Sequence, residues 1–260
     1  MARGAEGRIT RGTTGTNRLR RVDRWVARLP ALRRTPHPLV VDLGFGGSAA
    51  TPLELHRRLA AVNPRVEVVG VEIDPGRVRI ASASAVPGVS FRVGGFEVPT
   101  ERRPTIIRAF NVLRQYDEHE VPDAWRRMTS RLTEDGTLVE GTCDEIGRVC
   151  SWVALGPAGP RTLTISLRLS GLELPSIVAE RLPKALIHRN VPGERVHELM
   201  LALDRAWRTN APLGVYSPAQ RWIATARTLA AAGWPVRDGV ARWRLGELTL
   251  DWDAVAPARL

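Results

Sequence analysis

The stretch Val40-Val-Asp-Leu-Gly-Phe-Gly-Gly-Ser48 decides the fold, because it joins an unbroken apolar run to a glycine-rich turn. Such a run is typical of a strand in a parallel sheet that is covered on both faces. Glycines at 44 and 46 permit positive φ and let a ligand approach the backbone closely. Taken alone, the turn is explained equally well as a tight connection between a strand and a helix.

A second apolar strand, Val68-Val-Gly-Val-Glu-Ile-Asp74, follows and ends in two acids. In Rossmann-like folds, an acid at the tip of the second strand accepts hydrogen bonds from a ribose diol. Glu72 has that position, whereas Asp74 precedes Pro75 and is better explained as a helix cap. Together the two strands predict a cradle for a nucleoside-containing cofactor.

Helix and strand patterns alternate over the first half of the chain. Strands are predicted at 39–43, 66–73, 89–93, 105–110 and 137–142, and helices at 17–29, 52–62, 75–85 and 121–132, the first of them capped by Asn17. This alternation implies right-handed βαβ units. We therefore predict an α/β protein with a doubly wound, mostly parallel, Rossmann-like sheet.

The pattern changes beyond Cys143. Strands at 149–155 and 162–169 are followed by three helices, and a hairpin of 240–245 with 247–252 around Gly246 closes the chain. We expect four parts: a flexible basic arm at 1–16, a core with its N-terminal helix at 17–142, an inserted α+β segment covering the substrate at 143–210, and residues 211–260 completing the core.

These motifs resemble those of class I, Rossmann-like S-adenosylmethionine-dependent methyltransferases over about residues 39–142. The first motif of that family runs acid-x-Gly-x-Gly, its second strand ends in Gly-Val-acid, and Leu132-Thr-Glu-Asp-Gly-Thr-Leu-Val139 is similar to its turn and fifth strand. The resemblance implies S-adenosylmethionine as cofactor. It places Asp42, Gly44 and Gly46 along the methionine part, Glu72 on the ribose and Ile73 on the adenine.

The chain departs from the family after the third strand, where an acid near the adenine amino group is common but Val93-Gly-Gly-Phe96 is present. The adenine contacts then fall to Gly95 and Phe96. The predicted cofactor-binding residues are Asp42, Gly44, Phe45, Gly46, Glu72, Ile73, Gly95 and Phe96. Nicotinamide dehydrogenases are the competing interpretation, although Ala49 replaces the third glycine of their fingerprint.

Methyl transfer requires a nucleophile held against the sulfonium methyl, and a base when that nucleophile must lose a proton. Asn111 follows the fourth strand, at the edge where open α/β sheets bind ligands, and His119 lies just beyond it. These two are the predicted catalytic residues, with a loop asparagine and a surface histidine as the alternatives. Tyr116 and Trp152 are predicted substrate contacts, and no spacing indicates a metal site.

The net charge of +11 is concentrated near the N-terminus, because residues 1–36 contain ten arginines and two acids. The rest of the chain is nearly balanced, which favours a small-molecule acceptor. RNA bound through the N-terminal arm is the alternative, since the first half also looks like tRNA guanine-N7 methyltransferases. A catalytically idle S-adenosylmethionine-binding protein is a third. Without an apolar run that suits a membrane span or a secretion signal, we expect a cytoplasmic protein.

Overall fold

The computed structural model describes residues 4–9 and 14–258, so residues 1–3 and 10–13 of the predicted basic arm lie outside the described residues. The chain forms two compact units. The first comprises Met1–Glu140, Glu145–Gly147 and Leu155–Gly159, and the second comprises Gly141–Asp144, Arg148–Ala154 and Pro160–Leu260. The boundary crosses strand β5 (Thr137–Cys143).

The first unit contains a doubly wound sheet. Its strands are β1 (Leu39–Leu43), β2 (Glu67–Glu72), β3 (Val89–Val93), β4 (Ile106–Phe110) and the start of β5, in the order β3-β2-β1-β4-β5. β1 pairs in parallel with both β2 and β4, and β2 pairs in parallel with β3. The strand order reverses between β1 and β4. Such folds bind ligands at this position, the topological switch point. The predicted Rossmann-like fold class is confirmed.

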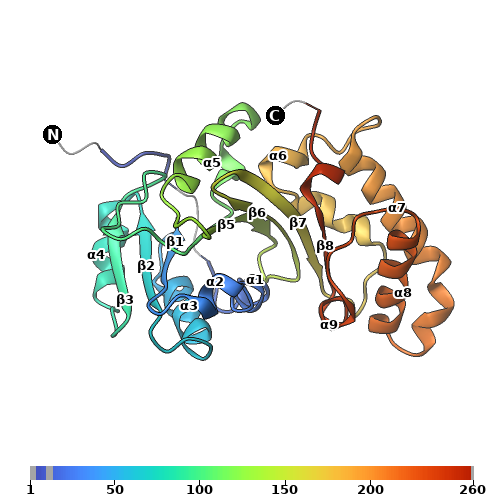
Figure 1. Ribbon diagram of the computed structural model, residues 1–260, viewed down its shortest axis with the longest axis horizontal. Coiled ribbons are helices and arrows are strands. Elements are labelled where there is room, and N and C mark those ends of the chain that lie inside the picture. The colour runs from blue at the N-terminus through green and yellow to red at the C-terminus, as the bar shows by residue number, and fades with distance from the viewer. Residues whose placement is uncertain (1–3, 10–13, 259–260) are drawn as a thin grey trace. The chain divides into compact units, whose positions relative to one another are not determined.

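Helices lie on both sides of these strands. They are α1 (Arg20–Val26), α2 (Pro30–Arg34), α3 (Ala50–Ala60), α4 (Pro75–Ser82) and α5 (Val121–Thr129), with the short 3-10 turns Leu113–Gln115 and Glu118–Glu120 before α5. Figure 1 shows α1, α2 and α3 gathered on one side of the strands and α5 on the other. α3 connects β1 to β2 and α5 connects β4 to β5, and right-handed connections that run in opposite directions along the sheet place their helices on opposite faces.

Of the two predicted helix caps, Asp74 caps its helix and Asn17 does not. The Asp74 carboxylate accepts the Arg77 N–H at 2.9 Å, so its predicted role as the cap of α4 is confirmed. Asn17 does not cap α1, which begins only at Arg20. Instead Asn17 has φ 61° and donates its backbone N–H to the Glu54 carboxylate at 2.9 and 3.0 Å. This contact with α3 overrides the local capping preference.

The second unit combines antiparallel strands with helices. It contains most of β6 (Val149–Gly156) and β7 (Gly159–Leu167), together with β8 (Glu247–Asp251), α6 (Lys184–Ile187), α7 (Arg195–Thr209), α8 (Pro218–Ala231) and α9 (Val240–Trp243). β7 and β8 pair antiparallel. Trp207 of α7 and Trp222 of α8 meet edge to face with ring centroids 6.1 Å apart, and the Trp222 indole donates to the Glu247 carbonyl at 3.1 Å.

The predicted antiparallel C-terminal strand is present, but its partner differs from the prediction. Residues 240–243 form α9 instead of a strand, and β8 pairs with β7. The helical turn closes through the Gly246 N–H, which donates to the Trp243 carbonyl at 2.8 Å. Gly246 has φ 80°, and a Cβ there would lie 2.0 Å from the Leu167 carbonyl oxygen. The glycine therefore ends a helix and admits a neighbouring strand, rather than turning a hairpin.

A buried ion network joins four elements of the first unit around Arg108 of β4. Its guanidinium donates from Nε to Asp42 Oδ1 of β1 at 2.9 Å and forms an ion pair with Asp23 of α1. Arg58 of α3 contacts the second Asp23 oxygen at 2.6 Å. Arg108 and Asp23 are fully buried. Burial raises the pKa of Asp23 to about 6 despite the opposing effect of Arg108 and Arg58.

Replacing Arg108 should therefore destabilise the first unit strongly. Arg108→Met leaves two buried carboxylates without their shared cation, so we expect the free energy of unfolding to fall by about 3–5 kcal/mol. The matched control is Arg102→Met, which removes an exposed ion pair with Glu67 at 2.7 Å and should cost about 0–1 kcal/mol. Urea unfolding of both variants measures the difference. Equal losses in the two variants would contradict this account of the network.

Candidate functional site

The glycine turn after β1 has the backbone geometry that its sequence predicts. Gly44 and Gly46 have φ of 72° and 79°, which side-chain-bearing residues rarely adopt. The Gly44 N–H donates to the Val71 carbonyl at 2.7 Å, holding the turn against β2. Across the turn, the Thr51 hydroxyl of α3 donates to Asp42 Oδ2 at 2.6 Å. The loop is thus fixed at both ends before any ligand arrives.

Glu72 places a carboxylate directly on this turn. Its Oε2 accepts the Gly46 N–H at 2.9 Å, and its Oε1 accepts the Ile73 N–H at 3.0 Å. The side chain is only 1% exposed. Arg77 lies 3.8 Å from Oε2, at the edge of ion-pair distance. The Glu72 carboxylate therefore joins the end of β2 to the glycine turn that follows β1.

The loop after β3 contains an acid that the sequence argument missed. Glu97 Oε1 accepts the Gly95 N–H at 2.8 Å, so this carboxylate folds back onto the glycine pair. Its other oxygen accepts the backbone N–H of Glu6 at 2.8 Å. The expectation that this loop lacks an acid is wrong, because the acid lies one residue beyond the quoted motif. Reading one residue further, to Val93-Gly-Gly-Phe-Glu97, would have found it.

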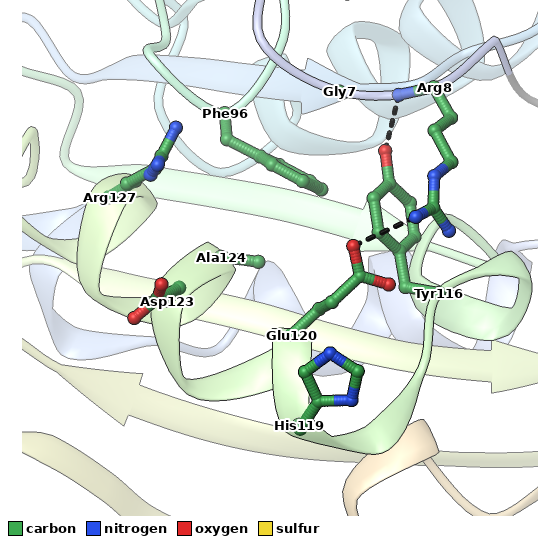
Figure 2. Close-up of a pocket in the computed structure, with 9 residues that line it drawn as sticks. All are labelled: Gly7, Arg8, Phe96, Tyr116, His119, Glu120, Asp123, Ala124 and Arg127. Atoms are coloured by element: carbon green, nitrogen blue, oxygen red, sulfur yellow. Dashed lines mark hydrogen bonds and ion pairs between the residues drawn. The ribbon is translucent and has the colours of Figure 1, made fainter.

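Two cavities adjoin the cradle in the first unit. A narrow cleft of about 20 Å³ is lined by residues of the strand tips and loops, among them Gly44, Glu72, Ile73, Gly95 and Phe96. A larger cavity of about 470 Å³ lies next to it and is lined by residues of the loop before α5 and of α5 itself, including His119, Glu120, Asp123 and Arg127. Gly7, Arg8, Phe96 and Tyr116 line both cavities, as Figure 2 shows for the larger one.

Five of the eight predicted cofactor-binding residues line the narrow cleft, namely Gly44, Glu72, Ile73, Gly95 and Phe96. Gly46 is not among the lining residues, and the side chains of Asp42 and Phe45 turn away from the cleft. The Asp42 carboxylate is engaged by Arg108 and Thr51 inside the sheet. The Phe45 ring is buried against α3, α4 and Phe91, with ring centroids 5.4 Å apart in the Phe45–Phe91 pair. At these two positions only the backbone is left to face a ligand.

The predicted catalytic and substrate residues occupy different places. Asn111 directly follows β4 with φ 59°, a strained conformation of the kind found at functional sites. Tyr116 lines both cavities and His119 lines the larger one. Trp152 is fully buried in β6 of the second unit and offers no surface to a ligand. The roles predicted for Asn111, His119 and Tyr116 stay predictions.

No protein-family model matches the chain, and no curated protein does. Among solved structures, the chain is similar to human N-acetylserotonin methyltransferase in complex with SAM, with 19% identity over 49% of this chain and 35% of that one, at a TM-score of 0.36. A putative O-methyltransferase from Nostoc punctiforme is 18% identical over 48% of this chain and 37% of that chain, with a TM-score of 0.37. A pericyclic reaction enzyme is 16% identical over 52% of this chain and 34% of that chain, with a TM-score of 0.38.

These solved structures include methyltransferases, the family that the sequence motifs resemble. The chain matches little more than a third of the length of each. At these identities and TM-scores, the similarities do not assign an activity to the chain.

Two further properties concern only the described part of the chain. Residues 4–9 and 14–258 contain no group of three or more histidine, cysteine, aspartate or glutamate side chains arranged to bind a metal. Within the same residues, no helix combines the length and apolar character that a membrane crossing requires.

Glu140 of β5 is a buried carboxyl that the sequence argument also missed. Burial raises its pKa from the ordinary 4.5 to about 8, and the interaction with the Trp125 side chain offsets only part of that effect. The residue is fully buried in the first unit. Its carboxyl is therefore protonated at neutral pH.

This raised pKa predicts a pH-dependent stability. The folded chain binds the Glu140 proton more tightly than the unfolded chain does, so the stabilisation is complete below pH 4.5 and is lost as pH rises to about 8. The loss should be on the order of 4 kcal/mol. Glu140→Gln, which mimics the neutral form, should flatten the unfolding free energy between pH 5 and 8, whereas the exposed control Glu134→Gln should not. An unchanged slope in Glu140→Gln would refute this assignment.

Proposed function

We propose that the chain is an S-adenosylmethionine-dependent methyltransferase that acts on a small-molecule acceptor. The observation that carries the proposal is the Glu72 carboxylate, which accepts the Gly46 N–H at 2.9 Å at the glycine turn. This arrangement combines a close backbone approach with an acceptor suited to a ribose diol. A nucleoside cofactor without phosphates satisfies both features.

The residues present fit such a cofactor. Gly44 and Gly46 would lie along its amino-acid part, where the absence of side chains permits a close approach. Glu72 would accept its ribose hydroxyls, and Ile73 would pack against its base. Phe96 and Glu97 supply a donor and an acceptor for the edge of that base. When bound, S-adenosylmethionine supplies an electrophilic methyl group on a sulfonium; the chain's own part is to orient it and to exclude water.

A dinucleotide fits this turn less well. Dinucleotide-binding folds direct the free N–H groups of the glycine loop at a pyrophosphate. Here the Gly46 N–H is already engaged by a carboxylate, and that negative charge repels phosphate, with Arg77 at 3.8 Å compensating in part. A cationic sulfonium meets no such repulsion. This distinction supports S-adenosylmethionine over NAD.

Two features support a small-molecule acceptor: the net charge outside residues 1–36, and the position of Asn111 after β4. Outside residues 1–36 the chain has a net charge of only about +3, which does not provide the broad basic surface of an RNA-binding face. Asn111 follows β4 at the switch point, so its side chain is our candidate for positioning the acceptor. His119, beside the larger cavity, is the candidate base for acceptors that must lose a proton.

Calorimetric titration tests the cofactor proposal. We expect the purified chain to bind S-adenosylmethionine and S-adenosylhomocysteine and not NAD. Glu72→Gln weakens the acceptor for the ribose, so the affinity should fall about 10- to 100-fold. The matched control is Glu67→Gln, at the opposite end of β2 and exposed, which should bind normally.

Binding of NAD alone would overturn the proposal in favour of redox chemistry. Transfer of a labelled methyl group from S-adenosylmethionine to a small-molecule pool, compared with transfer to tRNA or rRNA, distinguishes the acceptor classes. Cofactor binding without transfer to either pool would identify the chain as a binding protein without methyltransferase activity.

A further inference from the structure

Residues 4–9, which we term the N-terminal strap, contact the cofactor cradle through Glu6, Gly7 and Arg8. At Glu6 its backbone makes two hydrogen bonds with the loop after β3: the Glu6 N–H donates to Glu97 Oε2 at 2.8 Å, and the Glu6 carbonyl accepts the Phe96 N–H at 2.9 Å. The next residue, Gly7, packs between the side chains of Ile73, Phe96 and Tyr116. The strap thus contacts residues that the proposed function gives to the adenosyl group.

The two backbone groups of Glu6 match the hydrogen-bonding edge of adenine. Adenine presents an amino donor beside a ring-nitrogen acceptor. Glu6 presents an N–H donor and a carbonyl acceptor to the same two partners, the Glu97 carboxylate and the Phe96 N–H. A base with the reversed pattern would face Glu97 with an acceptor and leave both groups unsatisfied. The subsite is therefore selective for an adenine-like edge.

The strap also occupies the space that a base needs. A Cβ on Gly95 would lie 1.8 Å from the Glu6 carbonyl oxygen, so the two backbones are in direct contact. The cleft that remains is about 20 Å³, enough for about one water molecule. Ligand sites normally measure about 300–1,000 Å³. Because Gly7 and Arg8 line both this cleft and the 470 Å³ cavity, moving them would join the two spaces.

Charged and aromatic contacts hold the strap in place. Arg8 lies over the Tyr116 ring, 4.7 Å from its centroid, and contacts Glu120 at 2.9 Å. Figure 2 shows the Arg8 backbone N–H donating to the Tyr116 hydroxyl beside this stack. Glu6 forms an ion pair with Arg127 of α5. These contacts are exposed at their outer ends and individually weak, which suits a segment that releases.

We propose that the N-terminal strap is an intramolecular occupant of the adenine subsite, and that its release is required for an adenosyl ligand to bind. The identity of the full cofactor rests on the proposed function, whereas the occupied subsite rests on the contacts that Glu6 and Gly7 make in the cradle. Because only the open form binds, the apparent dissociation constant equals the intrinsic constant divided by the open fraction. Weakening the strap should therefore tighten binding without adding any contact to the ligand.

Two full-length variants weaken the strap while leaving the cradle intact. Glu6→Pro removes the backbone N–H that Glu97 accepts, and Arg8→Ala removes the stack on Tyr116 and the ion pair with Glu120. Arg28→Ala is the matched control, because it removes one exposed arginine outside the strap. Adenosine and S-adenosylhomocysteine are titrated into each by calorimetry. Hydrogen exchange at residues 4–9 is followed with and without saturating adenosine.

Both strap variants should bind adenosine about tenfold or more tightly than the wild-type chain and the control. Adenosine should also remove exchange protection from the strap in the wild-type chain. Equal affinities across all variants, or a strap that stays protected when adenosine is bound, would overturn the inference and leave the proposed function standing.

The remaining outcomes separate the two proposals. Tighter adenosine binding in the strap variants, with S-adenosylhomocysteine binding no better than adenosine, would support the strap and contradict the methyltransferase proposal. Failure of every variant to bind either ligand would overturn both.

Discussion

The geometry of the cradle depends on one buried guanidinium. Arg108 of β4 sits between Asp42 of β1 and Asp23 of α1, with the Thr51 carbonyl 3.2 Å from Nη2. Asp42 comes two residues before Gly44, and its second oxygen is held by the Thr51 hydroxyl. Hydrogen bonds within the chain therefore hold the glycine turn on both sides, at Asp42 and at Gly44. A buried network of this kind is costly when incomplete, and its members specify one arrangement when every partner is present.

Much of the first unit can be predicted from the sequence, because helix and strand patterns alternate there and the acids Asp42 and Glu72 lie at the ends of apolar strands. The apolar runs that end at Leu43 and Glu72 predicted the parallel strands, the glycine turn and the acid at the second strand tip. The role of Asp42 did not follow, because its partner Arg108, which it shares with Asp23, is 66 residues away in the chain. Glu97 could be read from the sequence, since it directly follows Phe96, but only the folded loop shows that its carboxylate turns back onto Gly95. The second unit was predicted less well, since residues 240–243 have an apolar pattern compatible with a strand or a helical turn.

The strap changes what the basic N-terminus means. In the sequence, Arg8 belongs to an arginine-rich leader that favours an anionic partner. In the structure, its guanidinium is used within the chain, against Tyr116 and Glu120. Residues near the N-terminus thus fill part of the cradle of the first unit, and the Glu97 carboxylate binds both the strap, at Glu6, and its own loop, at Gly95. Cofactor affinity and strap order are then two aspects of one equilibrium.

The most direct measurement is a crystal structure of the full chain with S-adenosylhomocysteine. The account predicts the ribose hydroxyls on Glu72, the adenine edge on the Phe96 N–H and the Glu97 carboxylate, and residues 6–8 displaced from the positions they hold here. A ligand bound elsewhere, or one bound in the cradle with Glu6 still paired to Phe96 and Glu97, would contradict it.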